Sequence, residues 1–234
     1  MNSNVFNYLK DHCVDGAVAF LGSAYVEAGL AVHREVCDQK ELILKNLNFQ
    51  KALVLEERNE TLLRFTYDEQ KREFVILSKH CEKDSQWVKH ASGELSAVVF
   101  AQAYSPDLGA LREHCNESVD VEDLYKQLWC RGLQYGPSFR GIQRLWRTCG
   151  QVLANIEIPN STLPGGHVHY LHPTVLDACF QSLTAALDTA AGETQLYLPV
   201  RIGKVRYCTS VSYNSSFGVQ NLQDWSFNNQ SLIF

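Results

Sequence analysis

The chain has 234 residues, of which 45% are hydrophobic, 20% charged and 11% aromatic, a globular composition that excludes wholesale disorder. The net charge of -5 and the mean hydropathy of -0.20 argue against a nucleic-acid binder, an anionic-membrane binder and a membrane-spanning protein. The polar start shows no secretory signal, and the eight scattered cysteines form no C-x-x-C pair. We therefore expect free, mostly buried thiols and a cytoplasmic protein.

The first half of the chain predicts one helix followed by about four strands. Small and apolar residues recur at helical spacing from Gly22 to Val36, which favours a helix pressed closely against a sheet. Alternating apolar segments separated by polar clusters then predict strands at 42–54, 61–67, 74–77 and 87–100. All prolines lie at or after Pro106, so none interrupts these elements. The order indicates an α+β fold dominated by antiparallel sheet.

The second half again combines a central helix with a set of strands. It follows a polar stretch, 105–120, which we interpret as a linker. An amphipathic helix is expected at 121–130, capped near Asp120. Strands at 141–147 and 151–158, a helix at 173–187 and strands at 196–200 and 204–208 are expected to follow. The expected domains are an N-terminal half at 1–104, a C-terminal half at 121–211, and a Ser/Asn-rich tail at 212–234 outside the conventional fold.

Two side chains in these halves could act as an acid and a base. Asp177 and Gln181 are four residues apart on the expected 173–187 helix, so they share one face. His12 comes shortly before the first expected helix. Taken alone, each has a simpler explanation. An aspartate near a helix start usually only interacts favourably with the helix dipole, and a lone histidine near a helix start is usually structural or exposed. Together, in equivalent places of two packed halves, they would suit elimination chemistry.

Clustered histidines offer an alternative, because His167, His169 and His172 could bind zinc. No acidic or cysteine partner follows at a metal-site spacing, so we expect no metal. The chain also lacks a G-x-S-x-G nucleophile motif and any glycine-rich phosphate-binding pattern.

Four segments, in one order along the chain, resemble the motifs of a known family. Residues 11–16 (DHCVDG) match H-x-x-x-G, and residues 133–139 (LQYGPSF) match Y-G-P-x-F. Residues 172–181 (HPTVLDACFQ) match H-P-x-x-L-D-x-x-x-Q, and residues 198–202 (LPVRI) match L-P-x-x-I. The chain therefore resembles the dehydratase domains of polyketide synthases, which are related to the animal fatty acid synthase dehydratase.

This resemblance implies a double hot-dog fold, in which each half wraps an antiparallel sheet around a central helix. It implies that His12 is the general base and Asp177 the general acid of a hydro-lyase. The substrate would be a β-hydroxyacyl thioester on the phosphopantetheine of an acyl carrier protein, and the product an α,β-unsaturated thioester. No cofactor would bind directly. Expected partners are the carrier protein, other synthase domains and a second copy of the chain in a homodimer, but neither nucleic acid nor a membrane.

Supporting roles follow from the same resemblance. Gln181 would orient the Asp177 carboxyl group, and Tyr135, Gly136 and Pro137 would shape the substrate tunnel. The remaining expected site residues are Gly16 of the histidine motif, Gly22 at the helix start, where backbone N–H groups could hold the thioester oxygen, and Leu21, which replaces the usual proline.

Two other functions remain open. Both ends look shorter than is usual for the family, which favours a catalytically inactive scaffold or docking fragment of a synthase. A product-template cyclase would use a similar histidine and aspartate pair on the same fold.

Overall fold

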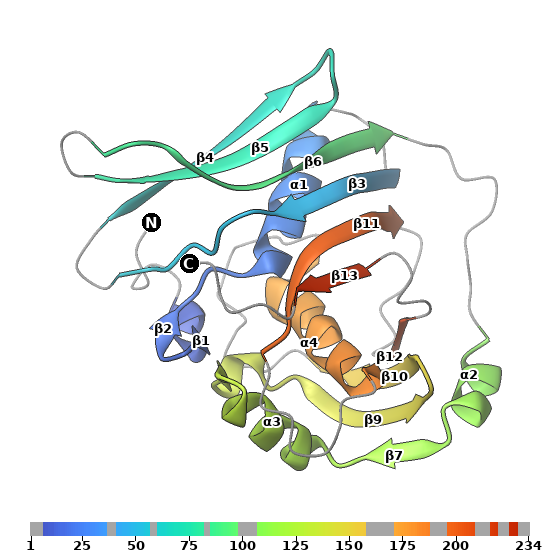
Figure 1. Ribbon diagram of the computed structural model, residues 1–234. Helices are drawn as coiled ribbons and strands as arrows, with labels where there is room; N and C mark the ends of the chain where they lie inside the picture. The colour runs from blue at the N-terminus through green and yellow to red at the C-terminus, as the bar shows by residue number, and fades with distance from the viewer. Residues whose placement is uncertain are drawn as a thin grey trace.

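The computed structural model describes residues 7–36, 41–56, 60–81, 85–97, 107–157, 171–187, 196–208, 216–219 and 225–228 (Figure 1). Its helices are α1 (Gly22–Val36), α2 (Leu108–His114), α3 (Val121–Cys130) and α4 (Pro173–Leu183), with short 3-10 turns at η1 (Asn7–Asp11), η2 (Pro137–Phe139) and η4 (Thr184–Ala186). Its strands are β1 (His12–Val14), β2 (Ala17–Val18), β3 (Glu41–Phe49), β4 (Thr61–Asp68), β5 (Glu73–His80), β6 (Val88–Ala97), β7 (Glu117–Val119), β8 (Leu133–Tyr135), β9 (Ile142–Thr148), β10 (Gln151–Ile156), β11 (Leu198–Cys208), β12 (Ser216–Val219) and β13 (Trp225–Asn228).

The described strands form three antiparallel sheets. The largest has six strands in the order β13-β11-β3-β6-β5-β4, and the second has four in the order β12-β10-β9-β7. A small sheet, β2-β1-β8, joins residues from both halves of the chain. The α+β pattern expected from the sequence is therefore present, and the small sheet already brings distant motifs together.

Each of the two larger sheets packs against one helix (Figure 1). Helix α1 buries Tyr25, Val26 and Leu30 against side chains of the six-stranded sheet. Helix α4 buries an apolar stripe against β9 and β10, and it also contacts α1. The molecule thus consists of two helix-and-sheet units side by side, which is the arrangement expected of two hot-dog halves.

The small residues of α1 explain its close approach to the sheet. A Cβ atom added at Gly29 would come 2.8 Å from a methyl group of Leu44 on β3, so a larger residue would push the helix away. The expected helix bounds, 22–36, are confirmed. Helix α3 also has its expected bounds, and the Asp120 side chain accepts a hydrogen bond from the Asp123 backbone N–H, as expected of a cap.

Several strands differ from expectation. The segments 196–200 and 204–208 belong to one strand, β11, which pairs with β3 in the sheet that covers α1. Strand β3 ends at Phe49, and only Val54 of the following segment forms an isolated bridge, with Ala19. Strand pairing needs a partner at the right register, and a single sequence does not reveal that partner.

The expected linker and tail also contain regular structure. Helix α2 and strand β7 lie within 105–120, and β7 pairs with β9. In the tail, β12 pairs with β10 and β13 pairs with β11. A Ser/Asn-rich segment can extend a sheet in this way because the bonds come from the backbone. These strands differ from the expectation that residues 212–234 lie outside the fold, whereas the domain boundaries themselves stay a prediction.

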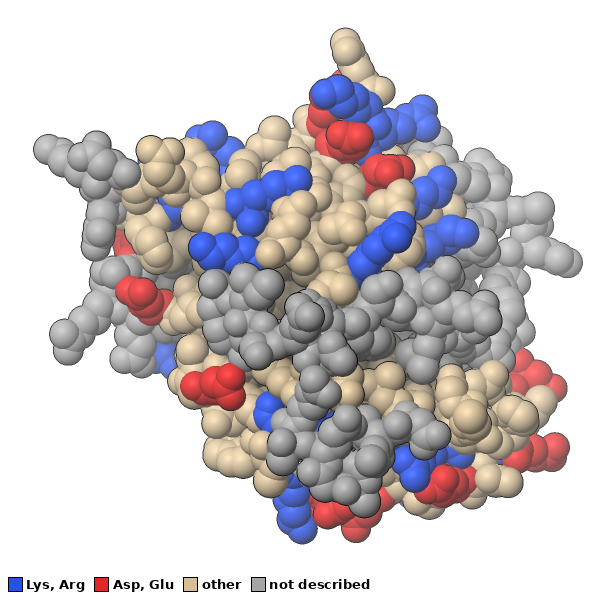
Figure 2. Space-filling model, in the orientation of Figure 1, with Lys and Arg blue, Asp and Glu red and all other residues tan. Residues whose placement is uncertain are grey.

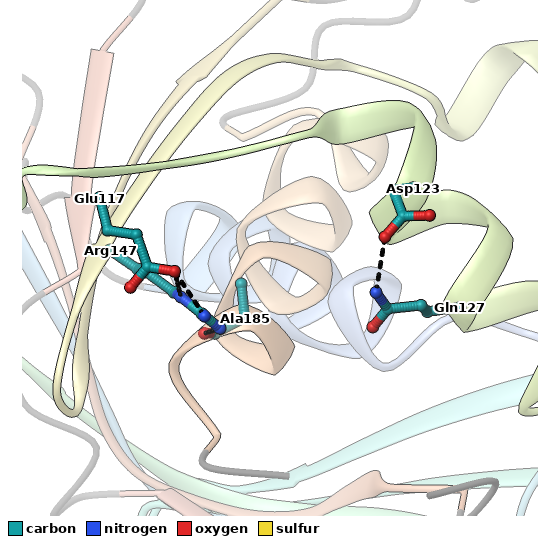
Figure 3. A network of polar contacts seen from close by, with 5 residues as sticks. All are labelled: Glu117, Asp123, Gln127, Arg147 and Ala185. Atoms are coloured by element: carbon teal, nitrogen blue, oxygen red, sulfur yellow. Dashed lines mark hydrogen bonds and ion pairs between the residues drawn. The ribbon is translucent and has the colours of Figure 1, made fainter. Parts of the chain in front are cut away.

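Arg147 connects three elements at the edge of the second unit (Figure 3). Its guanidinium group donates to the Glu117 carboxylate of β7 at 2.6 and 2.9 Å and to the Ala185 carbonyl oxygen after α4 at 3.4 Å. Figure 3 also shows Gln127 donating to Asp123 on α3, at 2.9 Å. Both ion-pair groups of Arg147 and Glu117 are partly exposed, so we assign this contact a modest stabilising role.

The surface and the cysteines match expectation only in part. Over the six-stranded sheet, Figure 2 shows Lys and Arg among uncharged residues with Asp and Glu at the upper end, and both charge signs also occur below it. No helix of the described residues is long and apolar enough to cross a membrane. The cysteines whose side chains the structure describes are free thiols as expected, but only Cys115 and Cys179 are buried. The set is Cys13, Cys81, Cys115, Cys130, Cys149 and Cys179. The expectation of mostly buried thiols is wrong for this set, since Cys81, Cys130 and Cys149 end or follow surface elements.

Candidate active site

His12 lies on β1, at the start of a tight hairpin. The two loop residues, Asp15 and Gly16, have φ angles of 48° and 81°, as a two-residue type I′ turn requires. The turn brings the backbone of Ala19 back to His12, whose Nδ1 lies 3.0 Å from the Ala19 carbonyl oxygen. A carbonyl oxygen can only accept, so Nδ1 carries the proton. In the neutral imidazole, Nε2 is therefore the basic nitrogen.

Asp177 lies in the second turn of α4, where only 5% of its surface is exposed. His172 caps this helix by accepting a hydrogen bond from the Thr174 backbone N–H, and Pro173 occupies the first helical position. Gln181, one turn later, donates to Asp177 Oδ2 at 2.8 Å and to the Phe139 carbonyl oxygen at 3.1 Å. The expected pairing of Asp177 with Gln181 is thus present, and Gln181 also connects it to η2.

The structure brings the two candidate catalytic groups together. His12 Nε2 lies 3.9 Å from Asp177 Oδ1, and the two side chains are only 10% and 7% exposed. Burial raises the pKa of Asp177, although the charge of His12 and the hydrogen bond from Gln181 oppose this effect. A raised pKa favours the protonated carboxyl group, which can donate a proton. The pair therefore places a base nitrogen beside a proton-donating acid.

Two aromatic rings pack against the His12 imidazole. The Tyr135 ring lies edge-on at a centroid distance of 5.5 Å, and the Phe139 ring lies at 5.3 Å. Desolvation and the nearby Asp177 carboxyl group raise the pKa of the Tyr135 phenol well above its usual value. These apolar neighbours help to exclude water, which strengthens the electrostatic interaction between the base and the acid.

The expected tunnel residues Gly136 and Pro137 form the turn between β8 and η2. Pro137 opens the 3-10 turn and is exposed, while Gly136 lies against Asp11. Leu21 is fully buried in an apolar cluster with Leu9 and Phe139 among others, so its side chain contributes packing. Gly22 begins α1, beside the Phe49 and Phe180 rings. The binding of a thioester oxygen at this helix start stays a prediction.

The alternative zinc site lies mostly outside the described residues, so it stays untested. His172 serves as a helix cap, while His167 and His169 lie outside the described residues. No three potential metal-ligating side chains gather among the described residues.

Three contributors to the site were missed by reasoning from the sequence. They are Ala19, whose carbonyl oxygen accepts from His12, Phe139, whose carbonyl oxygen accepts from Gln181, and Asp11, whose carboxyl group accepts from the Ser138 N–H. A backbone carbonyl leaves no signal in the residue type. Asp11 has such a signal, since a charged side chain directly precedes the candidate base.

Changing Gly16 to alanine tests the hairpin that positions His12. A residue with a Cβ atom at φ 81° costs about 1 to 2 kcal/mol, because the left-handed conformation crowds the Cβ against the backbone. We expect the melting temperature to fall by about 2 to 4 °C for each kcal/mol lost in a chain of this size. Thermal unfolding followed by circular dichroism checks this, with Gly109→Ala on the first turn of α2 as a control at ordinary φ. An equal effect of both changes would contradict the assigned turn.

Comparison with known proteins agrees with this geometry. Residues 1–79 match the family model of the polyketide synthase dehydratase domain, and residues 103–226 match that of the polyketide synthase dehydratase N-terminal domain. The Streptomyces venezuelae protein "Pikromycin polyketide synthase component PikAII" is 31% identical over 193 residues, which cover 79% of this chain and 5% of that protein. The chain therefore spans only a small part of this curated relative.

Solved structures share the fold. An inactive aspartate-to-asparagine mutant of the CurK dehydratase is 26% identical, with a TM-score of 0.81, over 93% of this chain and 77% of that one. An inactive histidine-to-phenylalanine mutant of the same dehydratase is 25% identical, with a TM-score of 0.79 and the same coverage. The two helix-and-sheet units are thus the expected double hot-dog fold. Its motifs and its fold agree with the family, and one family model matches more than half of its length. The chain therefore belongs to the polyketide synthase dehydratase family.

Proposed function

We propose that this chain eliminates water from a β-hydroxyacyl thioester held on the phosphopantetheine arm of an acyl carrier protein. The observation that carries the proposal is the buried pair of His12 Nε2 and Asp177 Oδ1 at 3.9 Å. Elimination needs a base and an acid at neighbouring carbon atoms, and this spacing suits them. In the CurK dehydratase, a histidine and an aspartate substitution each produce an inactive mutant, which supports a need for both kinds of side chain here.

His12 Nε2 takes a proton from the carbon next to the thioester carbonyl. The electron pair of that C–H bond forms the double bond, and the C–O bond to the β-hydroxyl breaks. Asp177 gives its proton to the leaving oxygen, so that water departs. The step leaves an imidazolium at His12 and a carboxylate at Asp177.

The same short distance explains how the site returns to its starting state. The charged pair is buried, and a proton passing from His12 to Asp177 restores a neutral base and a neutral acid. Desolvation favours this neutral state, since burial raises the pKa of Asp177. The protons balance over one turnover, and we propose that no bound cofactor is required.

The proposed partners follow from the substrate. The curated relatives are large synthases of which this chain matches one part, so further synthase domains are plausible neighbours. The carrier protein is proposed because it presents the thioester. A homodimer is a further proposal, which sedimentation of the purified chain would test.

A direct assay tests the proposed reaction. The chain is incubated with a β-hydroxyacyl thioester on carrier protein or on pantetheine, and the product is followed by mass spectrometry. We expect a loss of one water molecule and the appearance of the enoyl thioester. A folded chain that forms no enoyl product would favour the inactive scaffold, and cyclisation of a polyketone substrate would favour the product-template activity.

A further inference from the structure

Asp11, the residue directly before the proposed base, binds the turn Gly136–Ser138, which lies between Tyr135 and Phe139. The Asp11 carbonyl oxygen accepts a hydrogen bond from the Gly136 backbone N–H at 2.7 Å. Its carboxyl oxygen Oδ2 accepts another from the Ser138 backbone N–H at 2.9 Å. The two bonds join segments that are more than a hundred residues apart, one from each half of the molecule.

Gly136 makes this contact possible. A Cβ atom at this position would lie 2.5 Å from Asp11 Oδ1 and 2.6 Å from its Cγ, much closer than ordinary contacts allow. Its φ of −80° is open to any residue, so the glycine is required by the nearby carboxyl group and not by backbone conformation. Besides the tunnel role expected for it, Gly136 therefore leaves the space that the Asp11 carboxyl group occupies.

The turn leads on to the proposed acid. Phe139 ends η2, and its carbonyl oxygen accepts a hydrogen bond from Gln181. Gln181 in turn donates to Asp177 Oδ2, and Asp177 Oδ1 faces His12. His12 is bonded through the peptide to Asp11. The contacts thus close a ring that runs from the base to the acid and back, which we call the dyad ring: Asp11, His12, Ser138, Phe139, Asp177 and Gln181.

We propose that Asp11 is a positioning residue whose two hydrogen bonds to the Gly136–Ser138 turn set the separation of His12 and Asp177. This proposal rests on the proposed function for its kinetic consequences. Without the carboxyl group, the Ser138 N–H loses its acceptor and the turn can move relative to β1. A misplacement of about 1 Å between reacting groups can cost about 10²-fold in rate.

The test compares Asp11→Ala with Asp11→Asn, which keeps an acceptor oxygen for Ser138. We expect Asp11→Ala to lower kcat by about 10- to 100-fold with KM changed by less than about twofold, because the substrate surface is retained. Asp11→Asn is expected to recover most of the lost rate. Gly136→Ala, which presses a Cβ atom against the same carboxyl group, should reproduce the loss.

Asp107→Ala is the matched control. Asp107 also accepts a backbone N–H bond through its carboxyl group, at 3.0 Å from Ala110 N, but it caps the remote helix α2. We expect its kcat to stay within about twofold of the unaltered chain, although losing a cap costs about 1 kcal/mol. An equal fall in Asp107→Ala would overturn the proposal by showing a general effect of lost stability.

Two readouts separate positioning from folding. The limb of the pH profile of kcat that reports Asp177 should move to higher pH in Asp11→Ala, because the charge of His12 lowers the pKa of Asp177 less when the two groups separate. Nitrogen NMR of the His12 ring should show the Nδ1–H tautomer in both chains, because Ala19 still accepts from Nδ1, but the Nε2 resonance should shift in Asp11→Ala as Asp177 moves away.

The outcomes remain distinguishable from those of the proposed function. An unaltered chain without dehydratase activity would refute the function, while a shifted His12 Nε2 resonance in Asp11→Ala would still support the dyad ring. Conversely, Asp11→Ala with unchanged kcat and an unchanged His12 Nε2 resonance, in an active chain, would overturn the positioning role alone. An Asp11→Asn variant as slow as Asp11→Ala would overturn it as well.

Discussion

Replacing His12 with alanine is expected to lower kcat by about 10²- to 10⁴-fold, the usual contribution of a positioned general base. The side chain supplies the basic nitrogen that lies 3.9 Å from Asp177 Oδ1, and its Nδ1 is already engaged by Ala19. KM should change little, since the base acts mainly in the transition state. Steady-state kinetics with a β-hydroxyacyl thioester measures this change.

His114→Ala provides the control for that variant. His114 is exposed in the last turn of α2, far along the chain from the site, so its loss should leave kcat unchanged. A His12→Ala variant that folds and keeps full activity would rule out His12 as the base. Melting temperature reports whether each variant folds.

Asp177→Asn is expected to lower kcat by a similar factor, about 10²- to 10⁴-fold, because an amide cannot supply the proton for the leaving hydroxyl. The same change should stabilise the chain at neutral and higher pH. Burial raises the pKa of the folded Asp177, so folding takes up protons between the unfolded and the folded pKa. Stability from this group is complete below the unfolded value of 3.8 and is lost as the pH rises through the folded value.

The stability gain of Asp177→Asn should therefore depend on pH. Melting temperatures of both proteins should agree near about pH 4 and diverge as the pH rises, with asparagine the more stable, because each unit by which the folded pKa exceeds the unfolded one amounts to about 1.4 kcal/mol. Asparagine can still accept the hydrogen bond from Gln181. A variant that is less stable than the unaltered chain at about pH 8 would contradict the desolvation argument.

The chain contains a matched control for this experiment. Asp123 and Gln127 on α3 form the same bond at the same spacing, at 2.9 Å against 2.8 Å for Asp177 and Gln181, but they are exposed (Figure 3). Asp123→Asn removes a carboxylate from the same local geometry without removing one from the interior. We expect no loss of kcat and no stability gain that grows with pH.

The local elements could be predicted from the sequence because each depends on near neighbours. The spacing of small residues in 22–36 is sufficient for α1, and Asp120 identifies the start of α3. The four-residue interval from Asp177 to Gln181 predicts their hydrogen bond, since a helix places them on one face. The ends of the strands depend on distant partners, so β3 stops at Phe49, short of the expected end, and β11 continues across an expected break.

The pairing of distant segments could not be predicted in this way. Strand β11 joins β3, and β1 joins β8, through backbone bonds that any residue but proline can make. Leu21 illustrates the same limit: the sequence marks it as a departure from the family near the site, whereas the fold buries it among apolar side chains. Burial depends on what surrounds a residue, and the surroundings come from the whole chain.

By itself the sequence determined helices α1 and α3, the α+β class and, through four motifs, the family and the candidate pair His12 and Asp177. Only the tertiary structure decided their 3.9 Å separation, the proton on His12 Nδ1 and the link through Asp11. Motifs record which side chains are present, because side-chain chemistry is local. Distance, tautomer and desolvation arise when backbone carbonyls and apolar rings from both halves close around the pair.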